Sequence, residues 1–290
     1  MLKTVAFAFA VLAGAVQAQG THDPDVLRVA LLPDEDAATV IQDNAPLAAH
    51  LEAEIGRDIE MIVTTDYSSM IEAMRFGRID VAYFGPVSYT IAKERMAGGD
   101  LDIEPFAARV TDGSTTYRSV VIAGTGSGIV SVADLVGSGV DVAFGDPAST
   151  SSHYAPRHAL LLEGAVAGVD YEARFTGAHD AVARNVELGN AAAGGLSEPI
   201  FESLIDRGVI DATRVAVIHT TADLPQYPWV MRTDLTTGLR DGIRAAFLGL
   251  AQGTETGDAV LGPFKAERFA PITDADYDII RDIRKTVLDE

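Results

Sequence analysis

Four consecutive hydroxyl residues, Ser149, Thr150, Ser151 and Ser152, lie in the stretch FGDPASTSSHYAPRHALLLEG, residues 144–164. They follow an apolar run typical of a strand and precede an apolar pattern typical of a helix. The start of a helix offers unpaired backbone N–H groups, and hydroxyls there add donors for an oxyanion. A Ser or Thr before a helix usually only caps it. A cap needs one side chain, so the cluster leaves both an anion site and a simple cap open.

Two further hydrogen-bond donors lie at predicted strand-to-helix junctions like that of the hydroxyl cluster. Tyr67, in TTDYSSMIEAM, and His179, in FTGAHDAVA, each follow a predicted strand and begin a predicted helix. In open α/β sheets, ligands bind where strands lead into helices. A single Tyr or His is more often a core or surface residue than a ligand contact. Tyr67 and His179 therefore support a ligand site only together with the hydroxyl cluster.

The elements that must position these residues alternate regularly. Between residues 27 and 115, strands in VLRVALLP, IEMIVTT and IDVAYFG alternate with a helix in APLAAHLEAEIG and another from Ser68 to Phe76. Apolar residues at i, i+4 and i+8, closed by Gly56, define the first of these helices. This rhythm predicts a parallel sheet.

The same rhythm restarts after Tyr117 and continues to about residue 221, which predicts a second α/β lobe. The remainder contains a strand and two helical segments, too little for a third domain. We therefore expect the chain to cross over near 115–119 and return near 222–229. The predicted lobes are 19–116 with 226–290, and 117–225, with a solute cleft between them.

Composition narrows the function. The chain has 290 residues, 48% of them apolar, a net charge of −20 and no cysteine. The acidic balance argues against nucleic acid or anionic lipid as partners, and the lack of cysteine excludes thiol chemistry. Residues 1–18 have the pattern of a removed export signal. An uncleaved membrane anchor is the alternative, although the apolar run is short for the roughly 20 residues of a span.

Taken in order, DYSSMIEAMRFGRIDVAYFG, TYRSVVIAG, GDPASTSS, GAHDAVA and YPWVMR resemble the phosphate/phosphite/phosphonate-binding subunits of ABC transporters, over most of residues 28–270. The resemblance implies a type II periplasmic binding protein with two hinged α/β lobes (the Venus-flytrap architecture), a periplasmic monomer without cofactor that serves a membrane permease. It also implies that the oxyanion contacts are Tyr67, Tyr117, Ser149, Thr150, Ser151 and His179.

In members that bind 2-aminoethylphosphonate, two carboxylates hold the ammonium group. The resemblance places Glu198 at one of these positions. At the other, the chain has Gln226 and Tyr227, and the nearest acid is Asp223. Glu198 could instead be a first-turn acid that stabilises the helix dipole. Phosphite or a simple alkylphosphonate therefore stays an alternative ligand. Tyr227 is one of the expected ligand contacts in either case.

The same residues raise three other functions: hydrolysis, metal binding and ligand sensing. Ser149 or Ser151 with His179 and an acid could form a hydrolase triad, but no GxSxG elbow precedes the helix. None of the six histidines has metal-ligand spacing with a second histidine. A subunit that reports its ligand to a membrane receptor would use the same closed, liganded form, and the sequence leaves it open beside transport.

Overall fold

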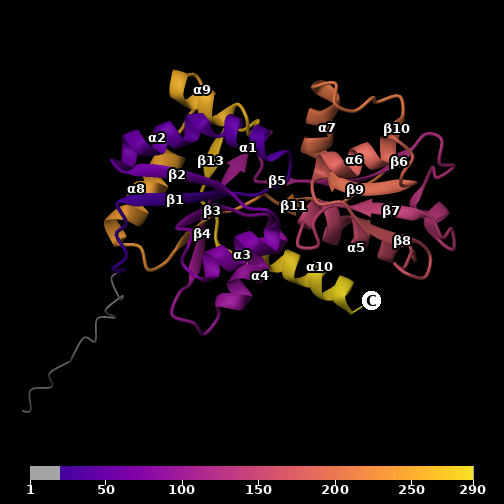
Figure 1. Cartoon of the computed structure of the whole chain (residues 1–290), viewed down its shortest axis with the longest axis horizontal. Coiled ribbons are helices and arrows are strands. Elements are labelled where there is room, and N and C mark those ends of the chain that lie inside the picture. The colour runs from indigo at the N-terminus through magenta and orange to yellow at the C-terminus, as the bar shows by residue number, and fades with distance from the viewer. Residues whose placement is uncertain (1–19, 290) are drawn as a thin grey trace, which may run out of the picture.

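The computed structural model describes residues 20–289, which form two α/β lobes lying side by side (Figure 1). The predicted export signal, 1–18, lies outside the described residues. Within 20–289, no helix is both long and apolar enough to cross a membrane.

Lobe one is built on a six-stranded sheet in the order β13-β4-β12-β3-β1-β2. β1 runs parallel to β2 and β3, whereas β12 is antiparallel to β3 and β4, and β13 to β4. The strands predicted in VLRVALLP, IEMIVTT and IDVAYFG thus pair in parallel as expected, but the complete sheet is mixed. The two reversed strands come from the C-terminal return of the chain, which enters this sheet from the opposite direction. The strands are β1 (Val26–Leu31), β2 (Asp58–Val63), β3 (Val81–Tyr83), β4 (Ile103–Val110), β12 (Trp229–Arg232) and β13 (Arg268–Ala270).

Helices cover this sheet and bury its apolar side chains. α2 packs against α8 and α9, and α3 packs against α4. α2 ends as predicted at Gly56, whose φ of 69° lies in the left-handed region that glycine adopts readily. The helices are α1 (Ala37–Asp43), α2 (Ala45–Ile55), α3 (Tyr67–Arg75), α4 (Pro86–Met96), α8 (Thr237–Leu248), α9 (Glu255–Leu261) and α10 (Asp278–Leu288).

Lobe two has a five-stranded sheet in the order β10-β6-β9-β7-β8. β7 pairs in parallel with β8 and β9, while β6 is antiparallel to β9 and β10. Its elements are β6 (Ser119–Gly124), a 3₁₀ turn at Val132–Leu135, β7 (Asp141–Phe144), a π-helical turn η2 (Thr150–Tyr154), α5 (Ala155–Leu162), β8 (Glu172–Phe175), α6 (His179–Glu187), β9 (Ala193–Ser197), α7 (Glu198–Asp206) and β10 (Val215–Thr220).

Two short strands connect the lobes. β5 (Thr116–Tyr117) pairs with β11 (Leu224–Pro225), antiparallel, where the chain leaves lobe one and returns to it. The lobe boundaries expected from the sequence fall at this ribbon, and as exact positions they stay a prediction. Two chain crossings at one place are what a hinge requires.

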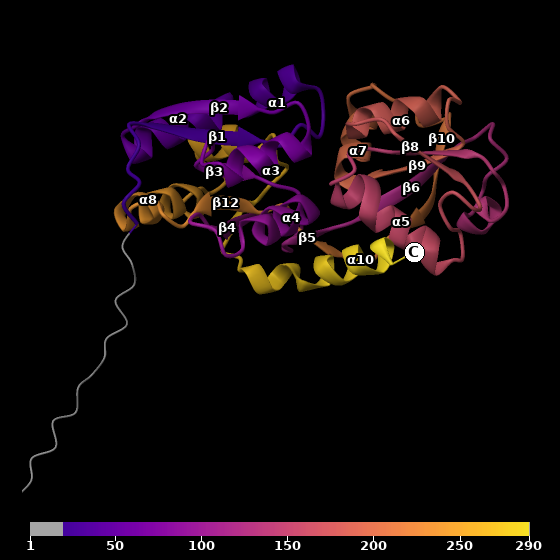
Figure 2. The ribbon, with the colours of Figure 1, turned by 60° about the horizontal axis from the view of Figure 1, so that its bottom comes forward.

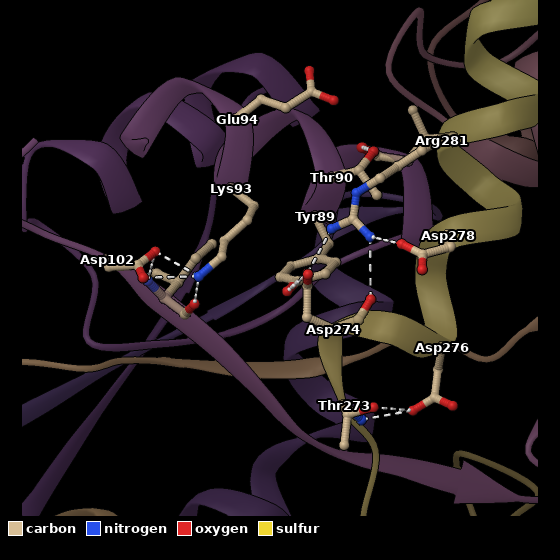
Figure 3. A network of polar contacts seen from close by, with 12 residues as sticks. Tyr89, Thr90, Lys93, Glu94, Asp102, Thr273, Asp274, Asp276, Asp278 and Arg281 are labelled. Carbon is tan, nitrogen blue, oxygen red and sulfur yellow. Dashed lines mark hydrogen bonds and ion pairs between the residues drawn. The ribbon is translucent and has the colours of Figure 1, made fainter. Parts of the chain in front are cut away.

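The C-terminal helix α10 forms a third connection. It runs along one side of both lobes (Figure 2) and packs on α4 of lobe one and on α5 and η2 of lobe two. Figure 3 shows how its start is fixed: Asp274 accepts hydrogen bonds from Tyr89 of α4 and from Arg281, and Arg281 also pairs with Asp278 at 2.6 Å. α10 is therefore anchored to α4 of lobe one at its start and also packs on η2, which begins within the hydroxyl cluster.

Candidate functional site

The hydroxyl cluster starts the helical segment that follows β7. Ser149 is the cap, because its Oγ accepts the backbone N–H of Ser152 at 3.1 Å. The first turn is π-helical, with Tyr154 N–H donating to the Ser149 carbonyl at 3.2 Å, and it continues directly into α5. π-Turns inside helices occur frequently at functional sites. The capping alternative is thus correct for one of the four residues.

The other three hydroxyls have separate contacts. Thr150 Oγ1 accepts the backbone N–H of Val87, in lobe one, at 2.7 Å. Ser151 Oγ lies 3.3 Å from the hydroxyl of Tyr227. Ser152 Oγ donates to the carbonyl of Gly195 on β9 at 2.7 Å. Ser152 therefore links η2 to β9 within lobe two, whereas Thr150 and Ser151 contact residues of the other lobe.

Two more hydrogen bonds close the cleft. The backbone N–H of Tyr67, at the start of α3, donates to Asp146 Oδ2 at 3.2 Å, and the N–H of His179 donates to the Asp34 carbonyl at 2.9 Å. Each joins the start of a helix in one lobe to a loop of the other. The structure therefore presents the two lobes in contact around the predicted site.

Four side-chain donors at this junction are buried and form no hydrogen bond of good geometry within residues 20–289. They are Tyr67 Oη, Tyr117 Oη, His179 Nε2 and Ser197 Oγ. The Ser149 hydroxyl lies near the first of them and the Ser151 hydroxyl near the second. Buried polar atoms are almost always hydrogen-bonded, so each exception needs an explanation. These four come from lobe one, the crossover ribbon and lobe two. We call them the orphan cluster.

Short contacts tie the orphan cluster together. The rings of Tyr117 and Tyr227 meet edge to face, 5.2 Å between centroids, and Tyr227 reaches Ser151. The backbone N–H of Ser197 donates to His179 Nδ1 at 3.1 Å. Tyr67 lies near both Tyr117 and Asp34, and the Asp34 carbonyl accepts the His179 N–H, so the predicted contacts border one junction.

In its neutral form, His179 presents an N–H donor to the junction between the lobes. Its Nδ1 accepts a backbone N–H, so the neutral ring carries its hydrogen on the unpaired Nε2. Burial lowers the pKa of His179 from 6.5 to about 3. The ring stays neutral at physiological pH and offers one N–H.

Tyr67 and Tyr117 are donors for the same reason. Burial, followed by the charge of Asp34, raises the pKa of Tyr67 well above its usual value. Burial also raises the pKa of Tyr117, and the nearby hydroxyl of Ser151 partly offsets this. Both phenols keep their protons. A cluster of neutral O–H and N–H donors suits an oxyanion.

A cavity of about 120 Å³ adjoins the cluster, since Ser197 and Tyr227 line it as well. It lies between the lobes. Its further lining comes from lobe one at Leu31, Leu32, Asp34, Glu35, Thr39, Val40, Asp43, Asn44, Tyr83, Arg109 and 263–265, and from lobe two at Pro199, Ile200 and Ser203.

Sequence reasoning missed two charged residues in this cavity. Asp34 follows β1, and its position just past the end of a strand was the available signal. Burial, with the neighbouring charge of Glu35, raises the pKa of Asp34 to about 7. Arg109 lies on β4, where a cation inside an apolar strand was the signal. Its Nε donates to Gln226 Oε1 at 2.9 Å and its Nη1 to the Phe264 carbonyl at 3.0 Å.

The expected ammonium contacts lie elsewhere. Glu198 begins α7 and forms a two-point ion pair with Arg118, at 2.8 and 3.2 Å. Asp223 lines a different hollow, beside α5 and α10. Neither residue lines the cavity next to the orphan cluster, and their contact with a ligand stays a prediction. Residues 20–289 contain no cluster of three potential metal ligands.

Comparison with known proteins decides the family. The chain matches the model of periplasmic substrate-binding proteins of phosphonate ABC transporters over residues 29–277. It belongs to this family. Members are substrate-binding components of transport systems and not enzymes, so the hydrolase alternative is excluded.

Two curated relatives agree. The phosphate-import protein PhnD of Mycolicibacterium smegmatis is 27% identical over 279 residues, which are 90% of this chain and 85% of that protein. The phosphonates-binding periplasmic protein of Escherichia coli is 25% identical over 256 residues, 86% of this chain and 74% of that protein.

Among solved structures, PhnD1 of Prochlorococcus marinus in complex with methylphosphonate superimposes with a TM-score of 0.83 at 21% identity, covering 91% of this chain and 99% of that one. A phosphonate-transporter binding protein of Pseudomonas aeruginosa gives 0.83 at 22% identity, covering 92% and 87%. These similarities show the type II periplasmic-binding-protein fold.

Proposed function

We propose that this protein captures a small phosphonate, such as 2-aminoethylphosphonate, between its lobes and delivers it to a membrane ABC permease. The observation that carries the proposal is the orphan cluster. Four donors, contributed by both lobes and the ribbon between them, lack hydrogen-bond partners among the described residues, inside a buried junction. A tetrahedral oxyanion there would accept all four hydrogen bonds.

The cluster also explains how binding reaches the permease. A ligand held by Tyr67 on one lobe and by His179 on the other favours the closed form by its differential affinity for the two states. Thr150 and Asp146 accept hydrogen bonds from the opposite lobe, and separation of the lobes would break both. A permease that recognises the closed form would accept loaded protein.

Phosphite or another small phosphorus oxyanion is the second candidate. It is favoured by the positions of Glu198 and Asp223, because the acids expected to hold an ammonium group lie away from the cavity. Such a ligand needs only the orphan cluster.

A thermal-shift panel tests the proposal, with 2-aminoethylphosphonate, methylphosphonate, phosphite, phosphate and sulfate as ligands. Ligand at about 100 times its Kd stabilises the protein by roughly 2.7 kcal/mol. We expect a shift with at least one phosphonate, and no shift with sulfate. A shift with phosphite or phosphate alone would favour the second candidate, and no shift with any of the five would refute both.

Uptake by cells that lack the gene distinguishes delivery from signalling. Loss of phosphonate uptake, restored by the wild-type gene, is expected of a transport subunit. Normal uptake together with a lost transcriptional response would assign the protein to a membrane receptor instead.

A further inference from the structure

The cavity beside the orphan cluster contains charges that the phosphonate site does not explain. Five charged residues line it, and two of them are paired with lobe two: Glu35 with Arg207, and Lys265 with Asp206 at 3.5 Å. Asp43 is exposed at the rim. Asp34 and Arg109 remain; neither has an ion-pair partner within 4 Å among residues 20–289, although Arg109 is near enough to act on Asp34 by lowering its pKa.

Arg109 is oriented but not neutralised. Two of its five N–H groups donate to neutral oxygens, those of Gln226 and Phe264. Gln226 is itself fixed, since its Nε2 donates to the Thr116 carbonyl at 3.2 Å and its carbonyl accepts the Tyr277 hydroxyl at 2.9 Å. An acid in place of Gln226 would pair with Arg109. The neutral amide leaves the guanidinium charge available to the cavity.

Asp34 brings a carboxyl group to the same cavity, and because its pKa is raised to about 7 the carboxyl is partly protonated near neutral pH when no cation pairs with it. Its backbone carbonyl is held by His179 N–H, which places the residue beside the orphan cluster. Uncompensated charges inside proteins are costly unless something pairs with them. A guanidinium recognises a carboxylate in a two-point geometry, and a carboxylate recognises an ammonium group.

We propose that Asp34 and Arg109 form a second subsite for the amino-acid end of the ligand, so that the preferred substrates are phosphonates that carry both an ammonium and a carboxylate group. Asp34 takes the ammonium and Arg109 the carboxylate, while the orphan cluster holds the phosphonate. The inference rests on the proposed function, because it assumes the phosphonate in the cluster.

Four ligands form a matched set for calorimetric titration of the purified protein: methylphosphonate with neither group, 2-aminoethylphosphonate with the ammonium, 3-phosphonopropionate with the carboxylate, and 2-amino-3-phosphonopropionate with both. We expect the last to bind at least about tenfold tighter than 2-aminoethylphosphonate, a factor within the range of one charge-assisted hydrogen-bond pair. Equal or weaker binding would overturn the proposal.

Single substitutions test which ligand group Arg109 and Asp34 each bind. Arg109→Gln should weaken binding of the two carboxylate ligands at least about tenfold more than that of methylphosphonate, and Asp34→Asn should do the same for the two ammonium ligands. Gln226→Glu should copy Arg109→Gln, because the new acid pairs with Arg109. Arg174→Gln, which removes an exposed charge on β8, is the matched control and should leave all four affinities unchanged.

The outcomes separate this proposal from the proposed function. If Arg109→Gln weakens all four ligands by the same factor, Arg109 serves the phosphonate and the second subsite is wrong. If the wild-type protein binds none of the four, the phosphonate assignment itself fails. Melting temperatures of the variants without ligand identify any loss that is caused by misfolding.

Discussion

The backbone N–H of Val87, at the start of α4, donates a 2.7 Å hydrogen bond to the hydroxyl oxygen of Thr150, at the start of η2 in the other lobe. Both residues are buried. Thr150 was expected as a ligand contact. The structure shows its oxygen engaged by the opposite lobe, so its hydroxyl links closure of the cleft to the site.

Replacing Thr150 by Val should therefore weaken ligand binding without changing which ligand is preferred. The buried N–H of Val87 would lose its acceptor in the closed form, which costs about 1–3 kcal/mol. Calorimetry should show an affinity loss of about tenfold or more for every ligand that binds. Thr90→Val is the control, since that hydroxyl bonds to the Val87 carbonyl within lobe one. Equal effects of the two variants would contradict a role in closure.

His179 should stay neutral across the physiological range. Its pKa of about 3, lowered by burial from 6.5, means that the unfolded chain binds a proton between these values and the folded chain does not. Stability should thus fall as pH drops from about 6.5 toward 3 through this group. His179→Gln keeps a donor and should lose that component, as measured by urea unfolding at several pH values. An unchanged slope would place the titrating proton elsewhere.

Asp34 should change the pH dependence of stability in the direction opposite to that of His179. With its pKa raised from 3.8 to about 7, the folded protein keeps a proton that the unfolded chain releases, so stability falls as pH rises from about 4 to 7. Glu35 and Asp180 act to raise this pKa and Arg109 to lower it. Asp34→Asn should remove the decline. If wild type and variant gave parallel curves between pH 4 and 7, the assigned pKa would be wrong.

The anchor of α10 should contribute to stability rather than to ligand choice. Tyr89→Phe removes the hydroxyl that donates to Asp274 and should lower the free energy of unfolding by about 0.5–1.5 kcal/mol. Relative affinities for different phosphonates should be unchanged, because Tyr89 is on the side of α4 that faces α10 (Figure 3). A change in ligand preference would show that α10 affects the site directly.

Local sequence signals predicted much of this molecule. Alternating strands and helices gave two lobes, Gly56 gave a helix end, and the strand-to-helix junctions placed Tyr67, Ser151 and His179. The reversed strands β12 and β13 were not predictable, because their direction depends on where the returning chain enters the sheet. Glu198 was placed near the ligand by the family resemblance and not by a local signal, and that contact stays a prediction. Its pairing with Arg118 depends on a residue 80 positions away.

Asp34 and Arg109 were missed for a related reason. Each is a single charged residue without a motif, and each becomes informative only when the fold shows it without an ion-pair partner. The identity of Gln226 was noticed from the sequence as a missing acid. In the structure, the neutral amide of Gln226 accepts a hydrogen bond from Arg109, so no acid at this position neutralises the guanidinium next to the site.

A crystal structure of the protein with 2-aminoethylphosphonate tests the central claim most directly. We predict that the phosphonate oxygens lie at hydrogen-bond distance from Tyr67 Oη, Tyr117 Oη, His179 Nε2 and Ser197 Oγ, the orphan cluster that finds no hydrogen-bond partner among the described residues. A phosphonate bound away from these atoms, or a complex in which they stay without partners, would contradict the account.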